Sequence, residues 1–323
     1  MGIFYPDNPK RMARLQQLVD GISNMQADVE HTGQQMDDQN AQYRPTINAL
    51  LEAKGMSSVD DVINDAASTM TSDERKVFEA LIQTVRDTKT GFDTTYFIAG
   101  LLMAPEGTVL TGKVAISVAR WGSRMINVKA LANFFTAADA GEAAAAAAAA
   151  EIVAEAEAAA EALEGVGEAA EAAEVAAEIA ETASMVSGVS VFLDVLAGIG
   201  LIVGLVAGLI EIFEGAEQKA KLIAAIHRLQ PARLTTALFK REGMNILDQL
   251  MTLKLYLDAS PGGSNPNPSA AAKASAYLST PPLTHIDLNE LETDLETQDR
   301  QLGGFYGGAD LSHDAVVSAT SKN

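Results

Sequence analysis

The feature that most constrains this chain is a largely apolar run at residues 186–210, in which Asp194 is the only charged residue. As a helix, a run of this length would be about 37 Å long, more than the hydrocarbon thickness of about 30 Å in a membrane. Gly200, Gly204 and Gly208 recur at every fourth position, as in the close-packing motif of membrane helices. A helix that is apolar on every side must be covered, either by lipid or by other helices.

These two coverings define two functional hypotheses, and the leading one is contact with a lipid membrane. Residues 186–210 would stay hidden until a conformational change exposes them, after which the protein, as an oligomer, forms a pore or permeabilises the bilayer. The three glycines would pack helix against helix, and Lys219, Lys221 and Arg228 would meet lipid headgroups. The predicted lipid-contacting residues are Val189, Phe192, Leu196, Ile199, Ile202, Val203, Leu205, Val206, Leu209 and Ile210.

The alternative is a soluble structural or protein-interaction bundle, in which residues 186–210 are only a buried core helix. Either way we expect helical partners, as a homo-oligomer or with partner subunits. The first ten residues carry no apolar h-region, so no signal peptide is predicted. We therefore expect a soluble chain that is cytoplasmic or released by a route without a signal peptide, and that is membrane-associated when active.

The N-terminal region has the pattern of a long helix of coiled-coil type over residues 9–54. Apolar residues recur at every seventh position, at Leu15, Ile22, Val29, Met36, Tyr43 and Leu50. Pro45 is expected to kink or break this helix, and Gly55 to end it. Ser57 and Ser58 before Asp60 and Asp61, and Thr71 before Glu74, predict the capped starts of two further helices.

The net charge of −20 is concentrated in an Ala/Glu-rich segment at residues 137–184, which has acidic residues but no Lys or Arg. Its glutamates recur at spacings of three and four, which puts them on one face of a helix. We interpret this face as solvated. The alternative is that the glutamates form a stripe that lines a water-filled space or responds to pH. An acidic chain of this kind lacks the basic footprint that nucleic-acid binding requires.

The C-terminal part begins with a linker at residues 261–269, rich in Gly, Pro and Ser, and continues as a helical arm over residues 270–323. Its acidic helix is expected to bury the face formed by Leu288, Leu291, Leu295 and Leu302. The tail from Gly303 onward is expected to be loose.

No pattern in the chain indicates catalysis, a cofactor or a metal site. There is no cysteine, and His31, His227, His285 and His313 are far apart in sequence, without a second ligand at metal-binding spacing. The glutamates recur too uniformly to single out an acid–base pair. We therefore predict that the protein is not an enzyme.

No segment shows the period-2 alternation of a sheet, so the predicted fold is all-α. We expect an elongated antiparallel helical bundle over residues 1–260, with long coiled-coil-like helices and a central glycine-rich apolar segment at residues 185–213.

This arrangement of long amphipathic helices around a glycine-rich apolar segment resembles the helical pore-forming toxins of the cytolysin A and haemolysin BL type. The resemblance covers residues 10–260 and implies that residues 186–210 are hidden in the soluble form and insert into a target membrane. The chain is also similar to uncharacterised fungal helical proteins, through Glu214 to Lys219, Leu222, Ala225, Ile226, Arg233 and Leu234.

Overall fold

The structure is a computed structural model, and it describes five helices. It covers residues 7–53, 55–68, 70–72, 74–76, 78–79, 216–258, 286–304 and 307–321, with residues 82, 128, 132 and 133. The helices are α1 (Asn8–Ala53), α2 (Val59–Ser68), α8 (Ala216–Asp258), α10 (Leu288–Gln301) and α11 (His313–Ser321). These residues contain no strand, so the all-α prediction is confirmed for this part of the chain. The predicted segments at residues 137–184, 185–213 and 261–269 lie outside it.

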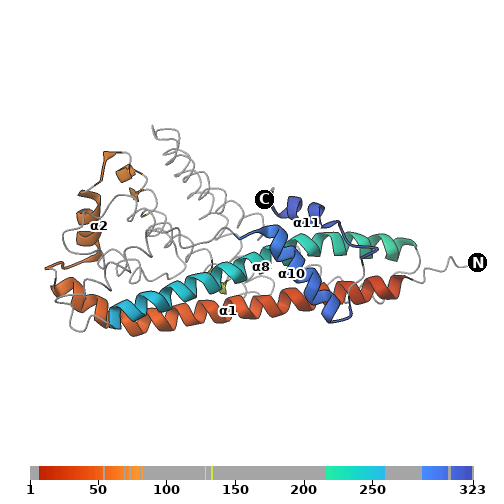
Figure 1. Ribbon diagram of the computed structural model, residues 1–323, viewed down its shortest axis with the longest axis horizontal. Coiled ribbons are helices and arrows are strands. Elements are labelled where there is room, and N and C mark those ends of the chain that lie inside the picture. Colours follow the sequence, from red (N-terminus) through yellow and green to blue (C-terminus); the bar gives the residue numbers. More distant parts are fainter. Residues whose placement is uncertain are drawn as a thin grey trace, which may run out of the picture.

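The heptad face predicted for the N-terminal region is buried along α1. Leu15, Ile22, Val29, Met36 and Tyr43 are each at most 4% exposed. Such a stripe must pack against another helix, and α8 lies beside α1 over most of its length (Figure 1).

α1 and α8 run parallel, because residue numbers rise together along the two helices. Near their starts Asn8 Nδ2 donates to Gln218 Oε1 at 2.9 Å. Farther along, Lys240 Nζ lies 2.6 Å from Asp28 Oδ2, and Lys254 Nζ lies 5.6 Å from the centre of the Tyr43 ring. Our expectation of antiparallel packing is wrong for this pair, because the chain enters both helices at the same end.

Pro45 does not break α1, which is a single helix from Asn8 to Ala53. Proline removes one backbone donor, but the neighbouring Tyr43 and Ile47 are buried, at 4% and 1% exposure. Burial of these side chains holds the last turns in place although one hydrogen bond is lost.

The predicted end of α1 and the predicted start of α2 are both observed. Gly55 has a φ of +69°, and the N–H of Met56 donates to the carbonyl of Leu51 at 2.9 Å. At the start of α2 the Asp61 carboxylate accepts from the Ser57 N–H and hydroxyl, both at 2.8 Å. These hydrogen bonds lower the pKa of Asp61.

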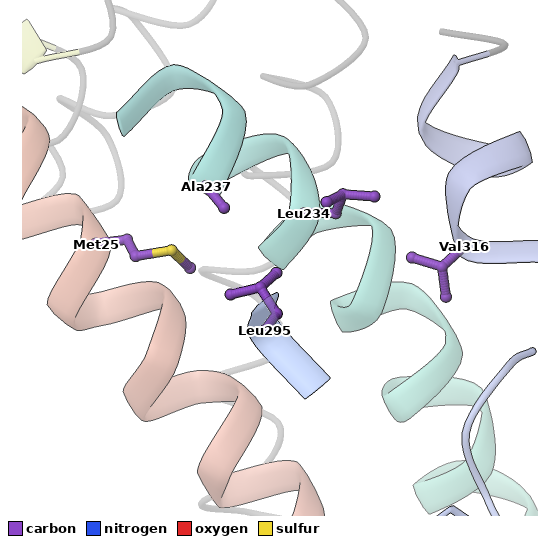
Figure 2. Packing of buried hydrophobic residues seen from close by; sticks show 5 residues of the cluster. All are labelled: Met25, Leu234, Ala237, Leu295 and Val316. Atoms are coloured by element: carbon purple, nitrogen blue, oxygen red, sulfur yellow. The ribbon is translucent and has the colours of Figure 1, made fainter. Parts of the chain in front are cut away.

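The two C-terminal helices pack against the α1–α8 pair. Figure 2 shows their apolar contact, in which Met25 of α1, Leu234 and Ala237 of α8, Leu295 of α10 and Val316 of α11 meet. Our expectation of a loose tail after Gly303 is therefore wrong for residues 307–321, because α11 buries Val316 completely.

The parallel pair predicts a strong effect of truncating its core. Leu18 of α1 is 0% exposed, so Leu18→Ala should lower the free energy of unfolding by about 2–5 kcal/mol, measured by urea denaturation. The matched control is Leu255→Ala in α8, where the side chain is 67% exposed and a change of at most about 0.5 kcal/mol is expected. Equal effects of the two substitutions would contradict the observed core.

Candidate functional site

The most unusual site in the described residues is a cluster of charged side chains buried where the C-terminal helices meet the α1–α8 pair. Arg14 comes from α1, Arg233 from α8, Asp299 from α10, and Asp310 from the turn before α11. Their side chains are between 1% and 6% exposed. We refer to these four residues as the ionic junction.

Asp299 is the centre of the ionic junction, because two guanidinium groups share one of its oxygens. Oδ2 of Asp299 lies 2.5 Å from Arg14 Nη1 and 2.7 Å from Arg233 Nη1. Arg14 also donates through Nε to Asp310 Oδ2 at 2.9 Å and through Nη1 to Gln17 Oε1 at 2.9 Å. One carboxylate therefore connects α1, α8 and α10, and Arg14 extends the connection to the chain before α11.

The local sequence makes room for these charges. A Cβ atom at Gly21 would lie 2.8 Å from Arg233 Nε, so glycine at this position lets the arginine pass close to α1. Further hydrogen bonds hold the turn before α11 on α8. The N–H of Leu311 donates to Gln230 Oε1 at 2.8 Å, and His227 Nε2 lies 3.1 Å from the carbonyl oxygen of Ala309.

Hydrogen bonding in the ionic junction is incomplete. Among the described residues, Arg233 Nε, Asp299 Oδ1 and Asp310 Oδ1 are buried without a hydrogen-bond partner. A buried ion pair has a large desolvation cost, and removal of one partner leaves the other charge unpaired. The junction therefore favours one arrangement of the four segments over arrangements that separate the charges.

Two carboxyl groups near Arg14 and Arg233 have raised pKa values. Burial raises the pKa of Asp310, although Arg14 opposes the shift. Burial also raises the pKa of Glu292 on α10 to about 7, and the nearby negative charge of Glu296 adds to the effect.

A cavity of about 690 Å³ lies between α1, α8 and α10. Its lining is mixed, with Met25 and Leu295 among the apolar residues and Arg233, Lys240 and Asp299 among the charged ones. The size is within the range of small-molecule sites, and the ionic junction forms part of the wall.

The predicted membrane-contact and helix-packing residues between Val189 and Ile210 lie outside the described residues. Of the predicted headgroup residues, Lys219 and Lys221 are half-buried and Arg228 is exposed on α8. Lys221 and Arg228 are seven positions apart and share a face, whereas Lys219 lies on the opposite side of the helix. The three basic residues therefore do not form a single surface.

The ionic junction was not predicted, because its central residue Asp299 lies on the buried face of α10, where an apolar residue is expected. The predicted leucine face is confirmed in part, because Leu295 is buried and Leu288 and Leu291 pack against the same core, whereas Leu302 is 72% exposed. The helix also buries Glu292 and Asp299. The residues at 292, 295 and 299 are spaced by three and four, so they do form one face. Arg14 and Arg233 form ion pairs with Asp299 and so offset the cost of burying this carboxylate.

In the part of the chain that the structure describes, no helix has the length and apolar character needed to cross a membrane. Comparison of the whole chain with protein-family models, with curated proteins and with solved structures gives no match.

The ionic junction predicts a large loss of stability when Asp299 is neutralised. Asp299→Asn leaves two buried arginines without their shared anion, so the free energy of unfolding should fall by about 3–5 kcal/mol in chemical denaturation. The matched control is Asp7→Asn, because the Asp7 pair with Lys10 is solvent-exposed and 3.9 Å long, and at most about 1 kcal/mol should be lost. A loss for Asp299→Asn no larger than the control's would contradict a stabilising junction.

The raised pKa of Glu292 predicts a pH-dependent contribution to stability. Between its ordinary value of 4.5 and about 7, the folded protein holds a proton that the unfolded chain releases, so the free energy of unfolding falls as pH rises through this window. Glu292→Gln removes the ionisation and should raise stability at about pH 8 by about 1–2 kcal/mol relative to the native chain, with EDTA present to exclude divalent ions. The exposed Glu290→Gln on the same helix is the control, and identical pH profiles for the native chain and Glu292→Gln would refute the assignment.

Proposed function

We propose that this protein is a membrane-active helical protein that permeabilises lipid bilayers when residues 186–210 leave a buried position. The observation that carries the proposal is the length and charge of that run, which is long enough to cross a bilayer and has one charged residue, Asp194. Gly200, Gly204 and Gly208 support it, because small residues at every fourth position let helices pack closely inside lipid.

The described helices supply a scaffold for such a change. α8 begins at Ala216, six residues after the apolar run ends, and its start lies beside the start of α1. A movement of residues 186–210 would therefore act directly on the first turns of α8. The α1–α8 pair has its own buried core, which supports a role as the part that stays folded.

We further propose that the whole chain is an elongated bundle. α1 has 46 residues and is about 69 Å long, and residues 54–215 must return from its far end to the start of α8. A returning helix would run antiparallel to both members of the pair. The Ala/Glu-rich residues 137–184 are long enough for this, and their alanines would allow close approach.

In this mechanism the C-terminal arm, defined here as residues 286–321, acts as a clasp, which means that it contacts both α1 and α8 and holds them together. It binds α8 between His227 and Ala237 and reaches α1 through Arg14. While the clasp is closed, α8 is held against α1 near the end that follows the apolar run. Opening of the ionic junction would release this end for contact with lipid and for association of several copies.

The proposal predicts dye release from vesicles of phosphatidylcholine with a minor fraction of phosphatidylserine. Val203→Glu should abolish release, because a charge at the centre of a spanning helix costs about 2.5–3.5 kcal/mol. Met251→Glu is the matched control, since Met251 is 49% exposed toward the other end of α8 and release should persist. Gly204→Leu should weaken release by blocking close helix packing.

The soluble structural or interaction bundle is the competing function, and the same assay separates the two. The membrane proposal is wrong if the native chain neither binds vesicles nor releases their dye between about pH 4 and pH 8, the range in which carboxylates and histidines titrate. In that case residues 186–210 are a core helix, and Val203→Glu should instead lower the melting temperature.

A further inference from the structure

A second group of side chains, outside the ionic junction, brings together three atoms of the types that ligate metals. Glu292 and Glu296 lie one turn apart on α10, and His313 is the first residue of α11. One carboxylate oxygen from each glutamate and one imidazole nitrogen lie within 4.8 Å of one another. The two helices are therefore packed so that their ligand atoms converge.

We propose that Glu292, Glu296 and His313 form a binding site for one divalent transition-metal ion, of which Zn²⁺ is the best chemical match. One imidazole nitrogen and two carboxylate oxygens form a ligand set that Zn²⁺ accepts, whereas Mg²⁺ and Ca²⁺ prefer oxygen ligands alone. The three protein ligands leave a fourth position for water.

The state of Glu292 points independently to a ligand. Glu292 is only 7% exposed, and among the described residues no hydrogen bond or ion pair to its carboxylate is present. A buried carboxylate without a partner is unfavourable, and a cation bound to it removes that cost.

The geometry needs only a small closure. Zn²⁺ binds oxygen and nitrogen at about 2.0–2.2 Å, so its tetrahedral ligand atoms are about 3.4 Å apart. From within 4.8 Å, the atoms would approach by at most about 1.4 Å, which rotation of the glutamate side chains provides. Glu296 and His313 are half-buried, so the ion can enter from solvent.

Charges of both signs surround the cluster, because Arg14 and Arg233 lie near Glu292 and disfavour a cation, whereas the two glutamates attract one. Arg300 lies 3.4 Å from Glu296 Oε2 and orients that carboxylate from outside the cluster. Two glutamates and one divalent ion together carry no net charge. Binding would join α10 to α11 and so strengthen the C-terminal arm.

The test is calorimetric titration of the full chain, freed of metal with EDTA and dialysed, with ZnCl₂. We expect one Zn²⁺ per chain and a melting temperature raised by several degrees at saturating metal. His313→Gln and Glu296→Gln should each weaken this binding at least about tenfold, because each removes a ligand. His31→Gln and Glu290→Gln, which alter exposed residues of the same types, should bind like the native chain.

Two readouts separate a built site from general attraction of cations to an acidic chain. Co²⁺ in place of Zn²⁺ should give visible absorption bands that change in His313→Gln, and excess Mg²⁺ should not displace it. Circular dichroism spectra that match the native chain establish that the variants fold. Equal Zn²⁺ affinity in the native chain, His313→Gln and Glu296→Gln would overturn the proposal, as would displacement by Mg²⁺.

Discussion

The attachment of the C-terminal helices to the α1–α8 pair depends on one buried carboxylate, Asp299, which two arginines share. Arg14 and Arg233 lie on helices that are adjacent along most of their length, so their like charges would repel if Asp299 were absent. This carboxylate belongs to α10, so the C-terminal arm supplies the negative charge that neutralises Arg14 and Arg233. Apolar contacts around Leu234 and Leu295 then complete the attachment.

This division of roles explains why one end of the α1–α8 pair differs from the other. Toward Tyr43 the pair is held by its heptad core and by single contacts such as that of Lys254 with the Tyr43 ring. Toward Arg14 the apolar core continues, with Leu15 and Leu18 at 0% exposure, and the ionic junction adds charges that are unfavourable when separated. Separation of these groups would leave charges buried without partners, so the junction favours the closed arrangement that the structure shows.

Much of the fold could be predicted from sequence where the pattern is local. The heptad of α1, its end at Gly55 and the serine caps of α2 depend on residues close together in the chain, and these predictions are confirmed. The partner of α1 and its direction could not be predicted, because an apolar stripe indicates that a face is buried but not what covers it. The continuation through Pro45 likewise depends on tertiary packing.

The site was harder to predict for the same reason. Asp299 and Glu292 are ordinary acidic residues in an amphipathic helix until Arg14 and Arg233 are brought beside them from other helices. His313 lies far along the chain from His227 and gave no ligand spacing, yet packing of α11 on α10 brings it to two glutamates. Three-dimensional proximity, and not spacing along one helix, created both clusters.

Hydrogen exchange followed by mass spectrometry on the native chain and Asp299→Asn tests most directly whether the ionic junction fastens the C-terminal arm. We predict faster amide exchange in α10 and α11 of the variant, with exchange in residues 36–53 of α1 unchanged, because that end has its own core. An equal change in all helices, or no change in α10 and α11, would contradict the central role of Asp299.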